Sequence, residues 1–328
     1  MLIELGGTTV AVESANEVVG EVLAEFYPAA RSGAAPVWTV TAIAQASPPG
    51  VAVNRFGVGF RPDMATRTLT LWSAREQDLA ITTRKCVREV FLDACERAGY
   101  TMLHASAIYR DGQVVVFAAD KRGGKTTLAL RAVLDHGWRW LSNDHLIVFD
   151  DGDDLVVTSL PTPIPVKVGT YADLADRLPP PWDGNGVDLA AWRAVPAGRR
   201  YVCDQAVYYT FGRLGQPNPV LVPLADRQLT LVFPSYAAPG RPHDVVERAP
   251  AGAVAGVLAG HVRTDWIGDQ RLHQRHLPFA HRDVAGFARD GAALAGRVGA
   301  AAGAVLRFVH RGDPGPLLAG LDRTEADR

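Results

Sequence analysis

The sequence predicts an α/β protein, with a β-rich region over residues 1–83 followed by an α/β domain over residues 84–328. Apolar and polar residues alternate as in strands through much of the first region. The second region contains an apolar strand, a glycine-rich loop, an amphipathic helix and another strand in direct succession, which is the order of an α/β core. A length of 328 residues suffices for about two domains.

Charge and cysteine content exclude several classes of function. Lys and Arg total 34 against 35 Asp and Glu, so no basic excess is present to neutralise nucleic-acid phosphates. The three cysteines lie far apart and lack C-x-x-C spacing, which argues against a zinc or redox motif and favours a reducing, cytoplasmic compartment. The N-terminus lacks the features of a signal peptide, and no apolar stretch reaches the ~20 residues of a membrane span. We therefore expect neither nucleic acid nor membrane as a partner.

Strands dominate the expected structure of the first region, together with one helix. The strands are expected at residues 1–4, 8–12, 37–42 and 68–72. A helix is then expected over residues 84–98, because Val87, Val90 and Phe91 recur at helical spacing and Gly99 stands where a left-handed C-terminal cap is typical. This helix would lead into the α/β domain.

The first half of the α/β domain has the clearest element signals. Asp111-Gly112 is a hairpin signal, and the apolar run over 114–118 is typical of a buried strand. Gly137 is placed to end the helix that follows the glycine-rich loop. The expected elements, in order, are a strand over 101–109, a strand over 114–118, a loop over 119–124, a helix over 125–136 and a strand over 138–141.

Two polar clusters in the rest of the chain resemble metal sites, and we interpret neither as one. The acidic run at 150–154 lies between expected strands and lacks the terminal Glu of a calcium loop, so it is expected to be a hairpin turn. The second cluster lacks sharp ligand spacing and is expected to be a polar helix face or loop. Its members are Arg271, His273, Arg275, His276 and His281. Further strands are expected over 146–149, 155–160, 201–211, 220–224, 229–233 and 304–309.

A phosphate-binding motif occupies the loop before the helix at 125–136. The segment Ala119-Asp120-Lys121-Arg122-Gly123-Gly124-Lys125-Thr126 fits the pattern G-x-x-x-x-G-K-[ST] except at its first position. Such a loop directs backbone N–H groups and the positive end of a helix dipole at a nucleotide phosphate. Lys125 would contact the terminal phosphates and the Thr126 hydroxyl would bind Mg²⁺. Arg122, Gly123, Gly124 and Thr127 complete the expected nucleotide-binding set. The alternative is an ordinary glycine-rich turn between a strand and a helix.

The motif and its surroundings resemble the HPr kinase/phosphorylase family. The resemblance rests on His104-Ala105-Ser106-Ala107, on the loop with GKTTLAL, and on Gly137-Trp138-Arg139-Trp140-Leu141-Ser142-Asn143-Asp144. It covers roughly residues 86–169, is weaker towards the C-terminus and is faint before residue 84. It implies a P-loop kinase core related to HPr kinase and phosphoenolpyruvate carboxykinase. Relatives of this family include kinases encoded with ribosomal peptide gene clusters, such as those of lasso peptides.

The resemblance also implies roles for individual residues. His104 would lie near the acceptor, and Asp144 would stand at the second position of an acidic pair that supplies a catalytic base and a Mg²⁺ ligand. Asp144 is therefore expected to act in catalysis and, together with Thr126, to bind Mg²⁺. Asn143 occupies the first position of that pair, and its amide cannot take a proton. Ala119 replaces the first loop glycine, and the sequence at 166–169 retains little of the Arg-Gly-rich signature of true HPr kinases, which disfavours HPr itself as the substrate.

Together these features predict a cytoplasmic kinase that uses ATP and Mg²⁺. The expected reaction is transfer of the γ-phosphoryl group to a Ser or Thr hydroxyl of a peptide or small protein, such as a biosynthetic precursor peptide. A small-molecule alcohol kinase, an inactive nucleotide-binding regulatory or scaffold protein and a slow nucleotide hydrolase stay open as alternatives. Assembly into a homo-oligomer, as in HPr kinases, also stays open.

Overall fold

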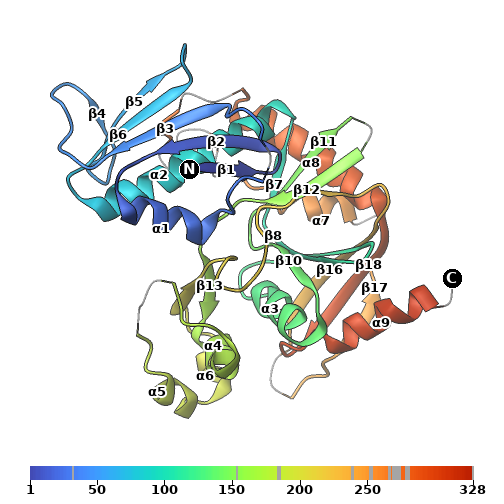
Figure 1. Ribbon diagram of the computed structural model, residues 1–328. Coiled ribbons are helices and arrows are strands. Elements are labelled where there is room, and N and C mark those ends of the chain that lie inside the picture. The colour runs from blue at the N-terminus through green and yellow to red at the C-terminus, as the bar shows by residue number, and fades with distance from the viewer. Residues whose placement is uncertain are drawn as a thin grey trace.

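The computed structural model shows a mixed α/β protein whose strands form two six-stranded sheets, one four-stranded sheet and one two-stranded sheet (Figure 1). It describes residues 1–326 except 32, 153, 183–185, 238–239, 251–253, 265–266, 268–274 and 278–280. Within these residues, no helix combines the length and apolarity that crossing a membrane requires.

The first sheet is built from the N-terminal region. Its strands, in spatial order, are β1 (Leu2–Leu5), β2 (Thr8–Glu13), β3 (Trp38–Ile43), β6 (Thr68–Trp72), β5 (Gly59–Asp63) and β4 (Ala52–Val53). The central strands β2, β3 and β6 are parallel, and the outer strands are antiparallel to their neighbours. Helix α1 (Glu17–Phe26) makes the crossover between β2 and β3, and Asn16 caps it by accepting a hydrogen bond from the Val19 N–H at 3.2 Å.

Helix α2 (Glu76–Arg97) starts eight residues before the expected position and packs with α1 on the N-terminal sheet. The boundary expected between residues 83 and 84 therefore falls inside this helix. Arg75 stands at its N-cap, and its side chain makes no capping hydrogen bond to the helix, so the sequence offers no capping signal there. One core joins Leu71 and Leu79 to Met102 and Phe287, which belong to the second region.

The second sheet carries the glycine-rich loop. Its strands, in spatial order, are β10 (Arg139–Ser142), β8 (Ala105–Arg110), β9 (Gln113–Ala118), β16 (Gln228–Tyr236), β18 (Ala302–His310) and β17 (Val245–Arg248). Strands β9, β16 and β18 are parallel, and β10 runs in the same direction because it is antiparallel to β8. The carboxyl ends of these four strands consequently meet at one edge of the sheet.

Helices cover both faces of this sheet. On one face lie α3 (Lys125–His136) and α9 (Gly315–Ala326), which bury Leu128 and Leu317 in a shared core. On the other lie α7 (Val254–Ala259) and α8 (Val284–Ala301), which bury Leu258 and Leu294. The expected strands over 114–118, 138–141, 229–233 and 304–309 and the helix over 125–136 are confirmed, with shifts of up to a few residues at their ends.

The predicted strand over 101–109 is two strands in two different sheets. Strand β7 (Thr101–Leu103) joins the four-stranded sheet, whose order is β15 (Val222–Pro223), β12 (Asp154–Ser159), β11 (Leu146–Asp151) and β7, while β8 joins the second sheet. The chain changes sheets at His104, whose N–H donates to the carbonyl of His261 at 2.8 Å. The hairpin expected around the acidic run is confirmed, since Asp151 pairs with Asp154 across β11 and β12.

The predicted strand over 201–211 is largely wrong. Within it, only β14 (Ala206–Tyr209) is a strand, and it pairs with β13 (Ile164–Lys167). The start of the predicted strand instead follows the short helix α6 (Ala197–Arg200), which Pro196 starts and Tyr201 caps. Three further elements complete this lobe, drawn yellow-green in Figure 1: α4 (Val168–Leu174), the 3₁₀ helix η1 (Ala175–Arg177) and α5 (Leu189–Ala194). Its apolar residues pack against α3.

The structure describes only part of the polar cluster at residues 271–281 that was expected on a helix face or loop. His276 lies outside helices and strands and is buried, with its Nδ1 2.8 Å from Glu89 Oε1. Cys86, Glu89 and His276 bring potential metal-ligating atoms within 4.8 Å of one another. Both ring nitrogens of His276 are already hydrogen-bonded, Nε2 to Asn54 at 2.9 Å, so we interpret the group as a buried hydrogen-bond cluster. Arg271 and His273 lie outside the described residues.

Candidate functional site

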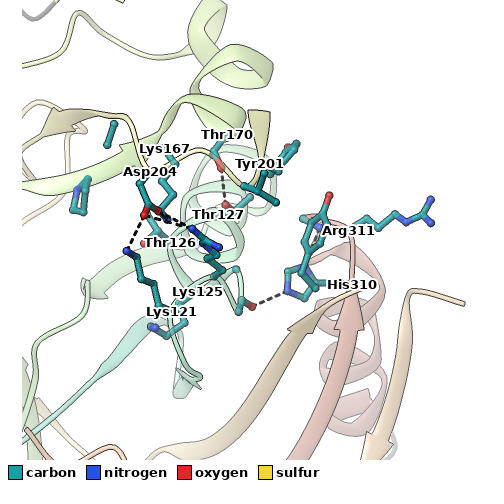
Figure 2. Close-up of a pocket in the computed structure, with 18 of the residues that line it drawn as sticks. Lys121, Lys125, Thr126, Thr127, Lys167, Thr170, Tyr201, Asp204, His310 and Arg311 are labelled. Atoms are coloured by element: carbon teal, nitrogen blue, oxygen red, sulfur yellow. Dashed lines mark hydrogen bonds and ion pairs between the residues drawn. The ribbon is translucent and has the colours of Figure 1, made fainter. Parts of the chain in front are cut away.

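A cavity of about 730 Å³ opens beside the carboxyl end of β9. Residues 121–124 of the loop and the start of α3 form one side, next to His104 and Asp144. The ends of β13, β16 and β18, the start of α4 and the segment from α6 to β14 form the rest (Figure 2). Eight of the nine site residues expected from the sequence line it: His104, Arg122, Gly123, Gly124, Lys125, Thr126, Thr127 and Asp144. The ninth, Asn143, lies behind this lining and contacts Thr126.

The two glycines of the loop are required by local geometry. Gly124 has φ +87° and precedes α3 as its N-cap, in a left-handed conformation that glycine adopts without strain. A Cβ at this position would collide with the ring of His310, and a Cβ at Gly123 would lie 2.5 Å from the Cβ of Ala119. The loop therefore folds back tightly on its own first residue and packs closely against the end of β18.

His310 at the end of β18 holds the loop in place. Its Nε2 lies 3.0 Å from the Gly123 carbonyl, and its Nδ1 accepts from the Gly312 N–H at 2.8 Å. A carbonyl accepts and an N–H donates, so these partners assign the neutral ring with its proton on Nε2. Burial lowers the pKa of His310, which keeps the ring neutral. Nothing in the sequence around position 310 signals this role.

Lys125 points its ammonium group towards the carboxyl ends of the neighbouring strands. Its Nζ donates to the Ala119 carbonyl at 2.8 Å and lies 3.3 Å from His104 Nε2 and 3.7 Å from Asp144 Oδ1. Burial lowers the pKa of Lys125, and the charge of Asp144 opposes that shift. A partly buried cation next to a loop that leads into a helix N-terminus is suited to bind a phosphate.

Asp144 and His104 form a polar pair next to Lys125. Asp144, the second residue after β10, has φ +58°, and its Oδ1 lies 3.5 Å from His104 Nε2. Burial raises the pKa of Asp144, but the hydrogen bond to His104 and the charge of Lys125 more than offset this and bring the pKa to about 2. Asp144 is therefore a carboxylate at neutral pH, held in an uncommon backbone conformation that is characteristic of functional sites.

Thr126 and Asn143 place two oxygen atoms side by side. The Thr126 hydroxyl donates to Asn143 Oδ1 at 2.9 Å, and Ser106 Oγ lies 3.4 Å from the same oxygen. Neighbouring ligands of an octahedral Mg²⁺ lie about 3 Å apart, because each Mg–O bond is about 2.1 Å. The two oxygens thus fit a Mg²⁺ site. The residue beside Thr126 there is Asn143 and not the expected Asp144, whose Oδ1 lies 3.7 Å from Lys125 Nζ.

The far side of the cavity is aromatic. The rings of Tyr201 and Tyr236 stack with centroids 5.6 Å apart and planes inclined by 26°, and Tyr236 also meets His310 edge-on at 5.8 Å. Between this pair and the loop, Thr127 and Thr170 share a hydrogen bond of 2.7 Å. The cavity therefore has a cationic end near Lys125 and a ring-lined end near Tyr201.

Asp204 lies at the mouth of the cavity among cations. It pairs with Lys167 at 2.7 Å, with Lys121 at 3.1 Å and with Arg122 at 3.4 Å (Figure 2).

Sequence reasoning missed Asp204, Tyr201, Tyr236 and His310, which come from the second half of the chain and match no motif. Comparison of the sequence with models of known protein families and with curated proteins finds no match.

Proposed function

We propose that the cavity binds Mg-ATP and that the protein is a kinase that transfers the γ-phosphoryl group to a hydroxyl of a peptide or small protein. One observation carries the proposal: Lys125, His104 and Asp144 lie within 3.7 Å of one another at the start of α3. A phosphate-binding cation, a carboxylate and a histidine in that arrangement provide charge stabilisation and proton acceptance at one point.

The nucleotide would lie along the cavity from its cationic to its aromatic end. The free N–H groups at the start of α3 and the Lys125 ammonium group would bind the β- and γ-phosphates. Thr126 and Asn143 would hold Mg²⁺, which neutralises phosphate charge when bound. The stacked pair of Tyr201 and Tyr236 offers a ring face of the kind on which a nucleobase stacks.

The transfer step follows from the same geometry. The acceptor oxygen forms a bond to the γ-phosphorus as the bond from that phosphorus to the β–γ bridging oxygen breaks, which leaves ADP. The hydroxyl proton passes either to the carboxylate of Asp144 or to a ring nitrogen of His104. A carboxylate with a pKa near 2 is a weak base, but phosphoryl transfer has a loose transition state that depends mainly on positioning and charge.

A second candidate is a nucleotide-binding protein without transfer activity, which would serve a regulatory or scaffold role. The observation that favours it is Asn143, an amide at the position where the resembled family has a carboxylate. A small-molecule alcohol as the acceptor is a variant of the kinase proposal, and the same assay distinguishes it. The acceptor, the preference for ATP and the cytoplasmic location all belong to the proposal.

Thermal unfolding with Mg-ATP tests the binding part. A ligand at 100 times its Kd adds about 2.7 kcal/mol to the free energy of unfolding, so we expect a clear rise in Tm. Lys125→Ala should abolish the rise, whereas Arg297→Ala, which removes an exposed cation paired with Asp150, should keep it. Absence of any shift in the wild type would contradict nucleotide binding.

Transfer of labelled phosphate from ATP to a library of Ser- and Thr-containing peptides and small alcohols tests the chemistry. We expect Asp144→Asn to bind Mg-ATP with nearly unchanged affinity and to lose transfer, because the carboxylate is needed next to the acceptor. Wild-type binding without phosphorylation of any hydroxyl would favour the second candidate, and release of free phosphate alone would indicate a hydrolase.

A further inference from the structure

The mouth of the cavity holds a cluster of positive charge, which includes Arg122 of the expected nucleotide-binding set and which takes no part in the transfer step. Lys121 and Arg122 extend from the glycine-rich loop, and Lys167 extends from the end of β13. All three line the same cavity as Lys125 and all three direct their charged groups at one carboxylate, that of Asp204. We name Lys121, Arg122 and Lys167 the cation cluster.

The charge of the cation cluster is not balanced. Asp204 is the sole carboxylate within ion-pair distance of its members in the part of the chain that the structure describes, so three cations face one anion. The hydrogen bonds from Lys167 and then Lys121 hold the pKa of Asp204 well below its usual range. Like charges that converge in a cleft repel one another and create a field that attracts anions.

Asp204 reaches the cluster from a separate segment. It follows α6 and precedes β14, and the same short segment carries Tyr201 and Val202 into the cavity. Its carboxylate bridges the glycine-rich loop, which follows β9 of the second sheet, to β13 of the two-stranded sheet. The carboxylate is half-exposed.

We infer that the cation cluster contacts the terminal phosphate of the nucleotide in addition to Lys125, and that Asp204 occupies the cluster while the cavity is empty. This inference rests on the proposed function. Binding of a triphosphate displaces the Asp204 carboxylate, because a phosphate offers more negative charge and more acceptor oxygens to the three cations. Asp204 therefore competes with the ligand, and its removal strengthens binding.

Calorimetric titration of three probes tests the inference: Mg-ATP, inorganic tripolyphosphate with Mg²⁺, and AMP. Asp204→Asn should lower the Kd of Mg-ATP and of tripolyphosphate by about three- to fivefold, the size expected for exposed ion pairs. The Kd of AMP, which lacks the terminal phosphate, should stay unchanged. Lys167→Met should raise the Kd of Mg-ATP, also when combined with Asp204→Asn. The changes should shrink in high salt, which screens exposed charges.

Asp176→Asn is the matched control, because it removes an exposed carboxylate that is paired with Arg193 away from the cavity. It should leave all three Kd values unchanged. Unchanged or weaker binding of Mg-ATP by Asp204→Asn would overturn the inference, as would equal tightening of AMP. Failure of the proposed function gives a different result from failure of this inference. In that case neither the wild type nor Asp204→Asn shows Mg-ATP binding that is lost on Lys125→Ala.

Discussion

At the scale of single residues, the site depends on how closely backbone segments approach one another. Gly124 and His310 illustrate this, because the ring that fixes the glycine-rich loop fills the space where a Cβ of residue 124 would lie. The Nε2 of the same ring donates to the Gly123 carbonyl, which ties the end of β18 to the loop, and its Nδ1 accepts from the Gly312 N–H. Substitution of Gly124 or of His310 is therefore expected to disturb the contact between the loop and the end of β18.

Gly124→Ala should destabilise the protein and abolish nucleotide binding. A non-glycine residue with positive φ costs about 1–3 kcal/mol, and the collision with His310 adds to that cost. The measurement is urea unfolding together with the Mg-ATP thermal shift. Gly20→Ala in α1 is the control, since a Cβ there meets nothing within 4 Å and alanine favours a helix. Equal stability of Gly124→Ala and the wild type would contradict the geometry of the loop.

His310 should make stability depend on pH. Its folded pKa is lowered, so the folded protein binds fewer protons at this site than the unfolded chain does. The contribution of the neutral ring is fully present above the unfolded pKa of about 6.5 and is lost as the pH falls from there towards the folded pKa. Protonation of Nδ1 would break the hydrogen bond from Gly312.

Unfolding free energies measured at several pH values between 7.5 and 5 check this prediction. We expect the wild type to lose stability on acidification and His310→Gln to show a smaller loss over the same interval. His243→Gln is the control, because His243 is exposed. A pH dependence that is identical in the wild type and His310→Gln would refute the prediction.

At the scale of elements, α2 unites the two regions through polar contacts in addition to apolar packing. Glu89 on this helix accepts from the backbone N–H groups of His276 at 2.7 Å and Leu277 at 3.1 Å, and it also contacts the His276 ring. Asn54 from the N-terminal region completes the cluster at His276 Nε2. The helix thus positions a segment from the second half of the chain against the first sheet.

Glu89→Gln should cost about 1–3 kcal/mol of unfolding free energy. The two backbone N–H groups of His276 and Leu277 share Oε2 as acceptor, and the His276 ring nitrogen contacts Oε1. Glutamine replaces one of these oxygens with an NH₂ group, so either the backbone donors or the ring donor loses its acceptor, and buried donors without an acceptor carry that cost. Glu21→Gln on the exposed side of α1 is the control and should change stability by less than about 0.5 kcal/mol. Equal effects of the two substitutions in urea unfolding would contradict the role of Glu89.

At the scale of the whole molecule, the two expected regions share a core. Val40 and Leu69 of the first sheet belong to the same buried cluster as Phe91 of α2 and Phe287 of α8. A boundary between residues 83 and 84 would cut α2 and expose this cluster. Shared burial of this kind couples the unfolding of both parts.

We expect one cooperative unfolding transition for the full chain. Calorimetric and van't Hoff enthalpies should agree, and fluorescence and circular dichroism should report the same midpoint. A variant that lacks residues 1–83 should fail to give a cooperative transition, because it loses the sheet against which α2 packs. Two separate transitions in the full chain, or cooperative unfolding of the shortened chain, would show that the regions are independent.

Much of the α/β core is predictable because its signals are local. The apolar run of β9, the glycines at 123 and 124 and the helix with its C-cap at Gly137 each depend on neighbouring residues. The extent of α2 and the break at His104 are not predictable in this way. The helix buries charged side chains such as Arg88 and Glu89 that hide its apolar period, and the break depends on a hydrogen bond to His261.

The sequence by itself determined the strand, loop and helix that present Lys125 and Thr126, because a chain of adjacent residues encodes a turn and a helix start. Tertiary structure alone decided what surrounds them. His310 is 187 positions from Gly123, and Asp204 is 83 positions from Lys121. Such residues meet because parallel strands end at a common edge and the lobe of β13 and β14 folds back over it. Contacts of that kind depend on the packing of distant segments, for which no local pattern exists.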